Sequence, residues 1–273
     1  MKKNTTAIER LLREGIFESK EAALPYLMSG AVFCGATLVT TGGQKIPMDL
    51  PITVRGLDDR YVSKGGYKLE GAIADFGIDV QGSICIDAGA CTGGFTDCLI
   101  KHGAALVYAV EVGFGQLSGS LAQNPHVVNL EKTNLGDETL LTLDPPPMLG
   151  SVDLSYLSLV KAVPQFRAIM QNKGTLLCLV KPLFETDDAV ARRTGEINPQ
   201  GYYPLLLKLM ANLNEQEHTC ITGVTHSPVT GNNGTHEFFL HVQFGLNQSA
   251  PDLSIDAKSA VDRVMALPKY QKT

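Results

Sequence analysis

Four charged residues stand at positions where the surrounding pattern calls for apolar side chains. Lys68 lies inside an apolar helical pattern, whereas Asp153, Lys181 and Glu237 lie at the ends of apolar runs that are typical of buried strands. Buried charges are costly unless they are paired, and two lysines with two acids make a neutral set. Such a set forms either two internal salt bridges or a catalytic group that exchanges protons with a substrate. Its place beside the nucleoside motif described next favours catalysis.

A glycine-rich segment follows the apolar run at residues 83–90. Asp87, Gly89, Gly93 and Gly94 belong to a G-x-x-x-G-G spacing, in which a tight turn brings backbone N–H groups close to a ligand at a helix N-terminus. Glu111 ends the next apolar run, where an acid can bind ribose hydroxyls. The spacing is not the dinucleotide fingerprint, and a Walker lysine is missing. The alternative is a turn that only joins a strand to a helix, but with Glu111 in register we expect a nucleoside cofactor other than NAD or ATP.

The elements that must position these residues alternate between helix and strand from Gly65 onward. Apolar patterns predict strands at 83–90, 106–112, 127–133, 148–155, 174–182, 218–229 and 236–244, with helices at 65–77, 93–103, 159–170 and 202–213. Continuous apolar strands that alternate with helices indicate an α/β fold, a doubly wound Rossmann-like sheet that is mostly parallel. A short loop joins the last two strands, so the last strand should be antiparallel. Asp153 and Lys181 end adjacent strands at the ligand-binding edge and should lie within reach of each other.

The chain has three predicted parts. Residues 1–58 form a small α+β module, residues 59–246 the α/β domain and residues 247–273 a polar tail. Residues 1–68 hold ten Lys/Arg and seven Asp/Glu on a chain whose net charge is −5. This mildly basic start favours a nucleic-acid partner, although an excess of three is also compatible with ordinary fluctuation.

Several classes of protein are disfavoured by composition. No run approaches the roughly 20 apolar residues that span a bilayer, and the N-terminus lacks the apolar stretch of a secretion signal. The six cysteines form no CxxC pair and no Cys/His cluster. We therefore expect a cytoplasmic protein with no membrane segment and no bound metal.

Six motifs then occur in order: residues 63–69 (SKGGYKL), 87–99 (DAGACTGGFTDCL), 109–117 (AVEVGFGQL), 151–159 (SVDLSYLSL), 179–185 (LVKPLFE) and 234–242 (GTHEFFLHV). In order and spacing they resemble the TlyA family, whose members are often labelled hemolysins. That family is similar to the FtsJ-type ribose 2′-O-methyltransferases of class I. The resemblance covers residues 8 to about 244 and implies S-adenosylmethionine-dependent methylation of ribosomal RNA.

The resemblance also implies a role for individual residues. Asp87, Gly89, Gly93, Gly94 and Phe95 would line the methionine and ribose part of S-adenosyl-L-methionine, Glu111 would bind the ribose hydroxyls, and Glu131 and Asn134 would flank the adenine. Lys68, Asp153, Lys181 and Glu237 match the catalytic tetrad of the FtsJ-type enzymes. Because a ribose hydroxyl must lose its proton as it attacks the methyl group, Lys181 is the candidate base. The two acids would orient it, and placement of the hydroxyl opposite the methyl would supply much of the rate.

Residues 8–50 resemble a small RNA-binding module named after a ribosomal protein. Leu11, Leu12, Ser19, Lys20, Met28, Gly30 and Val32 are among the matching positions. The expected partner is therefore ribosomal RNA or a ribosomal subunit, with Arg10, Lys20, Arg60 and Lys64 as candidate RNA contacts. The alternative is an appendage that only packs and touches no RNA.

The sequence also bears on three alternative functions. A cytolysin would need an amphipathic or apolar segment that inserts into a membrane, and none is evident. A catalytically silent RNA-binding protein would not need the intact tetrad. A methyltransferase acting on a base amino group is disfavoured because Asp153-Leu-Ser-Tyr stands where such enzymes carry Asn/Asp-Pro-Pro followed by an aromatic residue.

Overall fold

The computed structural model describes residues 4–14, 16–17, 19–55, 60–231, 234–246 and 249–267. The chain divides into two compact units, Met1–Arg60 and Tyr61–Thr273. The boundary that we expected between residues 58 and 59 falls outside the described residues.

The first unit is a small α+β assembly with its own core. Strand β1 (Asn4–Thr6) pairs with β4 (Lys45–Pro47), and β2 (Val32–Cys34) pairs with both β3 (Thr37–Val39) and β5 (Ile52–Val54), all antiparallel. Helices α1 (Ala7–Arg13) and α2 (Lys20–Met28) complete the unit. Thr6 and Glu9 cap α1 reciprocally, each side chain accepting a backbone N–H of the other residue. Leu11, Leu27 and Val32 are buried in the core.

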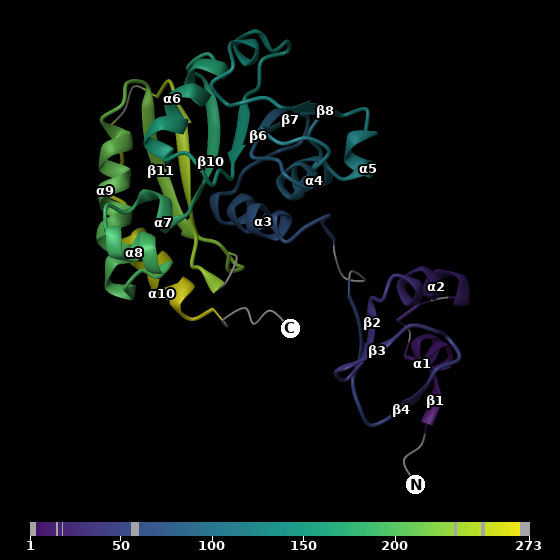
Figure 1. Cartoon of the computed structure of the whole chain (residues 1–273). Helices are drawn as coiled ribbons and strands as arrows, with labels where there is room; N and C mark the ends of the chain where they lie inside the picture. The colour runs from purple at the N-terminus through teal and green to yellow at the C-terminus, as the bar shows by residue number, and fades with distance from the viewer. Residues whose placement is uncertain are drawn as a thin grey trace. The chain divides into compact units, whose positions relative to one another are not determined.

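The second unit is built on a seven-stranded sheet with the order β11-β12-β10-β9-β6-β7-β8 (Figure 1). The strands are β6 (Ile84–Ala88), β7 (Leu106–Glu111), β8 (Val127–Glu131), β9 (Leu149–Val152), β10 (Gly174–Val180), β11 (Thr219–His226) and β12 (Phe238–Phe244). Only β12 runs antiparallel to its neighbours, β10 and β11, while the other described pairs are parallel. The predicted fold class, including the antiparallel last strand, is confirmed.

Helices cover both faces of this sheet (Figure 1). They are α3 (Gly65–Phe76), α4 (Gly94–Lys101), α5 (Gly119–Ala122), α6 (Leu159–Ile169), α7 (Pro182–Glu185), α8 (Ala189–Thr194), α9 (Tyr202–Asn214) and α10 (Ser254–Met265), with 3-10 turns at Glu138–Thr142 (η1) and Pro199–Gly201 (η2). Apolar side chains of α3 and α4 form one buried cluster with the sheet. Those of α6, α9 and α10 form the larger cluster. Burying both faces explains why the central strands are apolar throughout rather than alternating.

Part of the predicted polar tail is instead a packed helix. In α10, Ala257, Ala260, Val261 and Val264 recur at helical spacing and are buried in the larger core cluster. Arg263 of α10 also forms an ion pair with Asp75 of α3 and donates to the hydroxyl of Thr225 in β11. The low overall hydropathy of this segment concealed a narrow apolar stripe, and a stripe is enough to dock a helix on a sheet.

Candidate active site

The glycine turn after β6 is shaped by two close approaches of the chain. Gly89 has φ +83°, and a Cβ on it would lie 2.3 Å from the carbonyl oxygen of Asp153. Gly93, with φ +95°, precedes the first residue of α4, and a Cβ there would lie 2.3 Å from Leu121 and 2.8 Å from Leu117. Both positions thus require glycine, and the constraint at Gly93 comes from packing against these two leucines.

Asp87 lies beneath this turn and not on its surface. Its side chain is fully buried, and its carboxylate accepts hydrogen bonds from Thr96 Oγ1 at 2.7 Å and Ser151 Oγ at 2.8 Å. Burial raises the pKa of Asp87 to about 6, against the lowering effect of these two hydroxyls. Asp87 therefore joins β6, α4 and β9 from beneath the turn. This buried position does not agree with the prediction that the Asp87 carboxylate lines the methionine part of the cofactor site.

Glu111 closes the turn from the neighbouring strand. Its carboxylate accepts the backbone N–H of Cys91 at 2.9 Å and that of Gly113 at 2.8 Å. The side chain is 9% exposed, so only its outer edge reaches the adjoining cavity. The sequence separation that suggested a link between the glycine turn and Glu111 thus corresponds to a direct contact.

A cavity of about 190 Å³ opens at the carboxyl ends of β6, β7, β8 and β9. Its lining includes Gly89, Cys91, Glu111, Val112, Gln116, Thr133, Leu135, Asp153, Leu154, Ser155 and Tyr156. Apolar walls with a few convergent polar groups are what a nucleoside needs. We call this the nucleoside cavity.

The two residues expected beside adenine have other contacts. Glu131 accepts the backbone N–H of Gly115 at 2.9 Å, and that bond is the main reason why its pKa is lowered. Asn134 is exposed and accepts the N–H of Gly136 in a local turn. Thr133, which lies between these two residues in the chain, and Leu135, which follows Asn134, line the cavity instead. The turn after β8 directs the side chains of Thr133 and Leu135, and not those of Glu131 and Asn134, toward the cavity.

Lys68 and Glu237 form a buried ion pair. Lys68 Nζ donates to Glu237 Oε2 at 2.5 Å, and the two side chains are 6% and 5% exposed. Lys68 comes from the first turns of α3, and Glu237 immediately precedes β12. Burial raises the pKa of Glu237, while the nearby Lys68 ammonium opposes that shift.

Lys181 and Asp153 form a second ion pair, as their places after β10 and β9 predicted. Lys181 Nζ contacts Asp153 Oδ1 and donates to Ser155 Oγ at 2.8 Å. Within the described part of the chain, Asp153 Oδ1 has no aligned hydrogen-bond donor, so charge rather than hydrogen-bond geometry holds this pair. The pair is about one-fifth exposed and therefore faces the cavities more openly than Lys68 and Glu237 do.

A second cavity, of about 280 Å³, brings all four charged residues together. Its lining comprises Ser63, Lys64, Gly65, Lys68, Gly89, Ala90, Cys91, Thr92, Gly94, Phe95, Asp153, Lys181 and Glu237. It shares Gly89, Cys91 and Asp153 with the nucleoside cavity. We call it the tetrad cavity.

Sequence reasoning missed several of the lining residues. Gln116, Thr133, Ser155 and Tyr156 are polar or aromatic residues in loops that directly follow strands β7, β8 and β9. Their position at the carboxyl ends of parallel strands was a usable signal. Residue type alone was not a usable signal, because polar and aromatic residues are common in surface loops.

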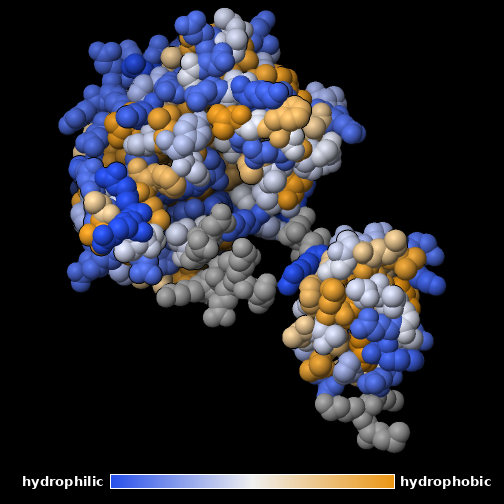
Figure 2. Space-filling view, in the orientation of Figure 1, coloured by the Kyte–Doolittle hydropathy of each residue, from blue (hydrophilic) through white to orange (hydrophobic). Residues whose placement is uncertain are grey.

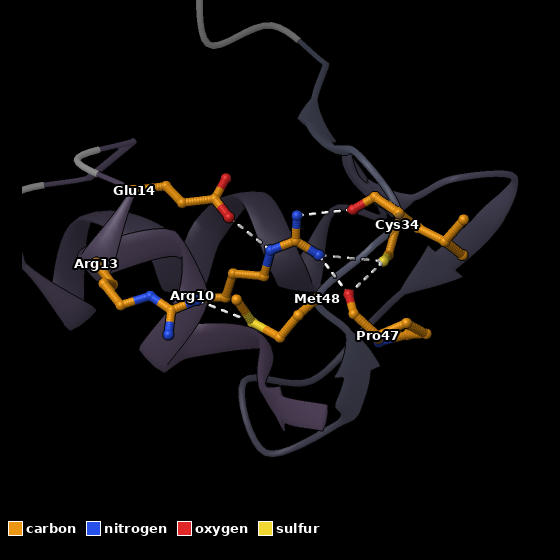
Figure 3. A network of polar contacts seen from close by, with 7 residues as sticks. Arg10, Arg13, Glu14, Cys34, Pro47 and Met48 are labelled. Atoms are coloured by element: carbon orange, nitrogen blue, oxygen red, sulfur yellow. Dashed lines mark hydrogen bonds and ion pairs between the residues drawn. The ribbon is translucent and has the colours of Figure 1, made fainter. Parts of the chain in front are cut away.

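Arg10 is a structural residue, contrary to its predicted contact with RNA. It is 4% exposed, and its guanidinium donates to the carbonyl oxygens of Pro47 at 2.5 Å and Leu50 at 2.7 Å (Figure 3). It also forms an ion pair with Glu14 at 2.7 Å. A guanidinium has five donors in a fixed fork, and here they join α1 to the segment after β4.

The other candidate RNA contacts lie nearer the surface. Lys20 begins α2 and is exposed, and Arg60 is exposed as well. Lys64 lines the tetrad cavity, where its ammonium also donates to the carbonyl oxygen of Thr230 at 3.5 Å. Lys64 is therefore placed to meet whatever enters that cavity.

In the part of the chain that the structure describes, no helix is long and apolar enough to cross a membrane. Figure 2 shows hydrophilic side chains interspersed among hydrophobic ones on the visible face of the second unit. The described residues also contain no group of three or more His, Cys, Asp or Glu side chains placed to hold a metal ion.

Comparison with known proteins agrees with this geometry. The model of a family described as FtsJ-like methyltransferase matches residues 61–244. The chain is 36% identical to YqxC of Bacillus subtilis, named as a candidate rRNA methyltransferase, over 89% of this chain and 87% of that protein. It is 32% identical to TlyA of Mycobacterium tuberculosis, named 16S/23S rRNA (cytidine-2′-O)-methyltransferase, over 93% of both. A solved structure from Streptococcus thermophilus, described as a candidate hemolysin, has a TM-score of 0.73, 30% identity and 97% coverage of both chains.

Proposed function

Because the chain belongs to the FtsJ-like methyltransferase family, we propose that it methylates the ribose 2′-hydroxyl of a nucleotide in ribosomal RNA, with S-adenosylmethionine as the methyl donor. The observation that carries this proposal is the pair of cavities that share Gly89, Cys91 and Asp153. One has the lining of a nucleoside site, and the other contains two lysines and two acids. The reaction needs such an arrangement, since donor and acceptor must meet at one point.

The residues of the nucleoside cavity suit S-adenosylmethionine. Glu111 offers a carboxylate edge to ribose hydroxyls, and Val112, Leu135 and Tyr156 offer apolar surface to a base. The N-terminus of α4, which begins at Gly94, would offer backbone N–H groups to the methionine end. When bound, the cofactor supplies an electrophilic methyl group on a sulfonium.

In the tetrad cavity the protein's own residues would prepare the hydroxyl. The ribose hydroxyl would give its proton to the neutral amine of Lys181 as its oxygen takes up the methyl group that the cofactor supplies. Asp153 would hold by charge the ammonium that results, and the Lys68–Glu237 pair lines the same cavity. Lys181 then returns the proton to water. Lys64, at the rim of the same cavity, suits contact with the RNA backbone.

The first unit would contribute to substrate binding. YqxC and the Mycobacterium tuberculosis TlyA align with more than four-fifths of this chain, and so with part of the first unit, which holds eight Lys/Arg and seven Asp/Glu. A ribosomal RNA substrate would place the protein in the cytoplasm. Lys20 and Arg60 are the exposed candidates for phosphate contacts.

The direct test uses purified protein, isolated ribosomal subunits, and cofactor labelled in its methyl group. We expect label in one subunit or in its naked RNA, and alkali-resistant linkages should map it to a ribose. Label on a base or on a ribosomal protein would overturn the ribose assignment, and absence of label from every ribosomal substrate would overturn the RNA assignment. Because some relatives carry hemolysin names, erythrocytes are exposed to the same preparation. Lysis that persists in a Lys181→Ala variant would indicate a membrane activity independent of methyl transfer.

A further inference from the structure

The hydroxyl of Ser155 lies where the two cavities meet. Ser155 follows β9 by three residues and lines the nucleoside cavity, whereas Lys181, which donates to Ser155 Oγ at 2.8 Å, lines the tetrad cavity. The contact therefore crosses from one cavity to the other. Ser155 lies in the 151–159 motif, but the family resemblance assigns it no functional role.

The chemistry of a lysine base explains why a second partner is useful. A neutral amine has two N–H groups and one lone pair, and the lone pair must face the hydroxyl that loses its proton. Asp153 lies against the nitrogen without an aligned hydrogen bond, so Asp153 alone leaves the amine free to rotate. Ser155 supplies the missing directional contact by accepting one N–H.

The segment that carries Ser155 is itself held in place. Ser158 caps α6, with its hydroxyl accepting the N–H of Val160, and it donates to Glu185 Oε2 at 2.7 Å. Glu185 Oε1 also accepts the N–H of Leu159 at 2.9 Å. Glu185 ends α7, the short helix that Lys181 precedes, so the segments after β9 and β10 are joined at both ends. A contact between two fixed segments suits orientation of a side chain.

We propose that Ser155 is a positioning residue for Lys181: by accepting one N–H it restricts the rotation of the neutral amine beside Asp153 and directs the lone pair into the tetrad cavity. This inference rests on the proposed function, in which Lys181 is the base. After the proton has moved, Ser155 still accepts one N–H of the ammonium, Asp153 attracts its charge, and the newly formed N–H faces the methylated oxygen. No bond to Ser155 forms or breaks.

The experiment compares Ser155→Ala, Ser155→Thr and Thr142→Ala with the unaltered full-length protein. Thr142 is a matched control because its exposed hydroxyl donates to the local backbone carbonyl of Thr139, on η1, away from both cavities. The first readout is single-turnover methyl transfer to ribosomal subunits at saturating cofactor, with cofactor affinity measured in parallel. We expect Ser155→Ala to lower the rate about tenfold, the effect of losing one directional hydrogen bond of ordinary strength. Ser155→Thr, which keeps the hydroxyl, should retain most of the rate.

The second readout does not depend on RNA. Lys181 is acylated with an amine-reactive reagent at fixed pH, and its labelling rate is read by peptide mass spectrometry, with Lys208 as the internal reference. Loss of the acceptor should make the neutral amine of Lys181 more available, so labelling should rise several-fold in Ser155→Ala and stay unchanged in Ser155→Thr and Thr142→Ala.

The two readouts separate the inference from the function on which it rests. If labelling changes as expected but no variant methylates ribosomal RNA, the contact stands and the proposed function fails. If the unaltered protein methylates RNA and Ser155→Ala matches it in rate and in Lys181 labelling, the positioning role is overturned. A rate loss that Ser155→Thr does not rescue would also overturn it, because the hydroxyl would not be the group that matters.

Discussion

Lys68 and Glu237 are 169 positions apart in the chain, yet their side chains form a buried ion pair 2.5 Å long at the wall of the tetrad cavity. Burying two charges costs several kcal/mol per ion, and the mutual attraction offsets that cost only when both partners are present. The fold therefore bears the desolvation free energy of two buried charges at this position, which agrees with a role of the pair in the site.

This pair leads to a prediction about stability. Lys68→Met should destabilise the protein by about 3–5 kcal/mol because it strands the buried Glu237 carboxylate. Lys68→Met with Glu237→Leu should recover most of that loss but not methyl transfer. Urea unfolding of the two single variants and the double variant measures the coupling. Strictly additive effects would show that the two side chains do not stabilise each other.

The base assignment predicts equal failure of two substitutions. Lys181→Ala and Lys181→Arg should both fold, bind S-adenosylmethionine about as well as the unaltered protein, and lose nearly all transfer. Alanine removes the proton acceptor, and a guanidinium does not give up its proton in the useful pH range. Melting temperature, calorimetric affinity and single-turnover transfer are measured on both. Substantial activity of Lys181→Arg would leave charge and positioning as the contribution of this residue.

Cofactor affinity should depend on Glu111, and fold stability should depend on Gly93. Glu111→Ala would remove the proposed partner of the ribose hydroxyls, so we expect a loss of about 1–3 kcal/mol in binding free energy by calorimetry. Gly93→Val should instead lower the melting temperature, because a side chain there meets Leu117 and Leu121 and the backbone has φ +95°. Unchanged affinity in a folded Glu111→Ala protein would remove Glu111 from the cofactor site.

Asp87 predicts a specific pH dependence of stability. Its folded pKa of about 6 exceeds the ordinary value of 3.8, so the folded state binds the extra proton between these two values. Its stabilising contribution is complete below about pH 4 and is lost as the pH rises through about 6, a change on the order of 3 kcal/mol. The difference in unfolding free energy between the unaltered protein and Asp87→Asn should therefore fall over that interval. A difference that stays constant from pH 4 to 7 would contradict the raised pKa.

Two basic residues of the first unit should behave differently when replaced. Arg10→Ala removes the donors to the carbonyl groups of Pro47 and Leu50 together with a buried side chain, and it should unfold or loosen the first unit, detected as lost protection from amide hydrogen exchange. Lys20→Ala should leave exchange unchanged while it weakens RNA binding and lowers the salt dependence of that binding. If RNA affinity and salt slope are also unchanged in Lys20→Ala, Lys20 does not contact phosphate.

The sequence by itself determined the catalytic fold and the place of its site. Apolar strands that alternate with helices admit few arrangements other than a doubly wound sheet, and parallel strands collect their carboxyl ends at one edge. Glycines spaced for a turn, with Glu111 about twenty residues later, therefore had to meet at that edge. The contact of Asp153 with Lys181 followed for the same reason, since each directly follows its strand.

Only the tertiary structure decided which polar residues are exposed and which are buried. Arg10 and Lys20 look alike in sequence as basic residues of one module, but the first is buried against carbonyl groups of a segment almost forty residues away. Asp87 has the motif position of a ligand-binding acid but bonds Thr96 and Ser151 inside the core. Helix and strand periodicity assigns a residue to a face of its own element. The partner that covers that face comes from packing between distant segments, and local sequence does not encode it.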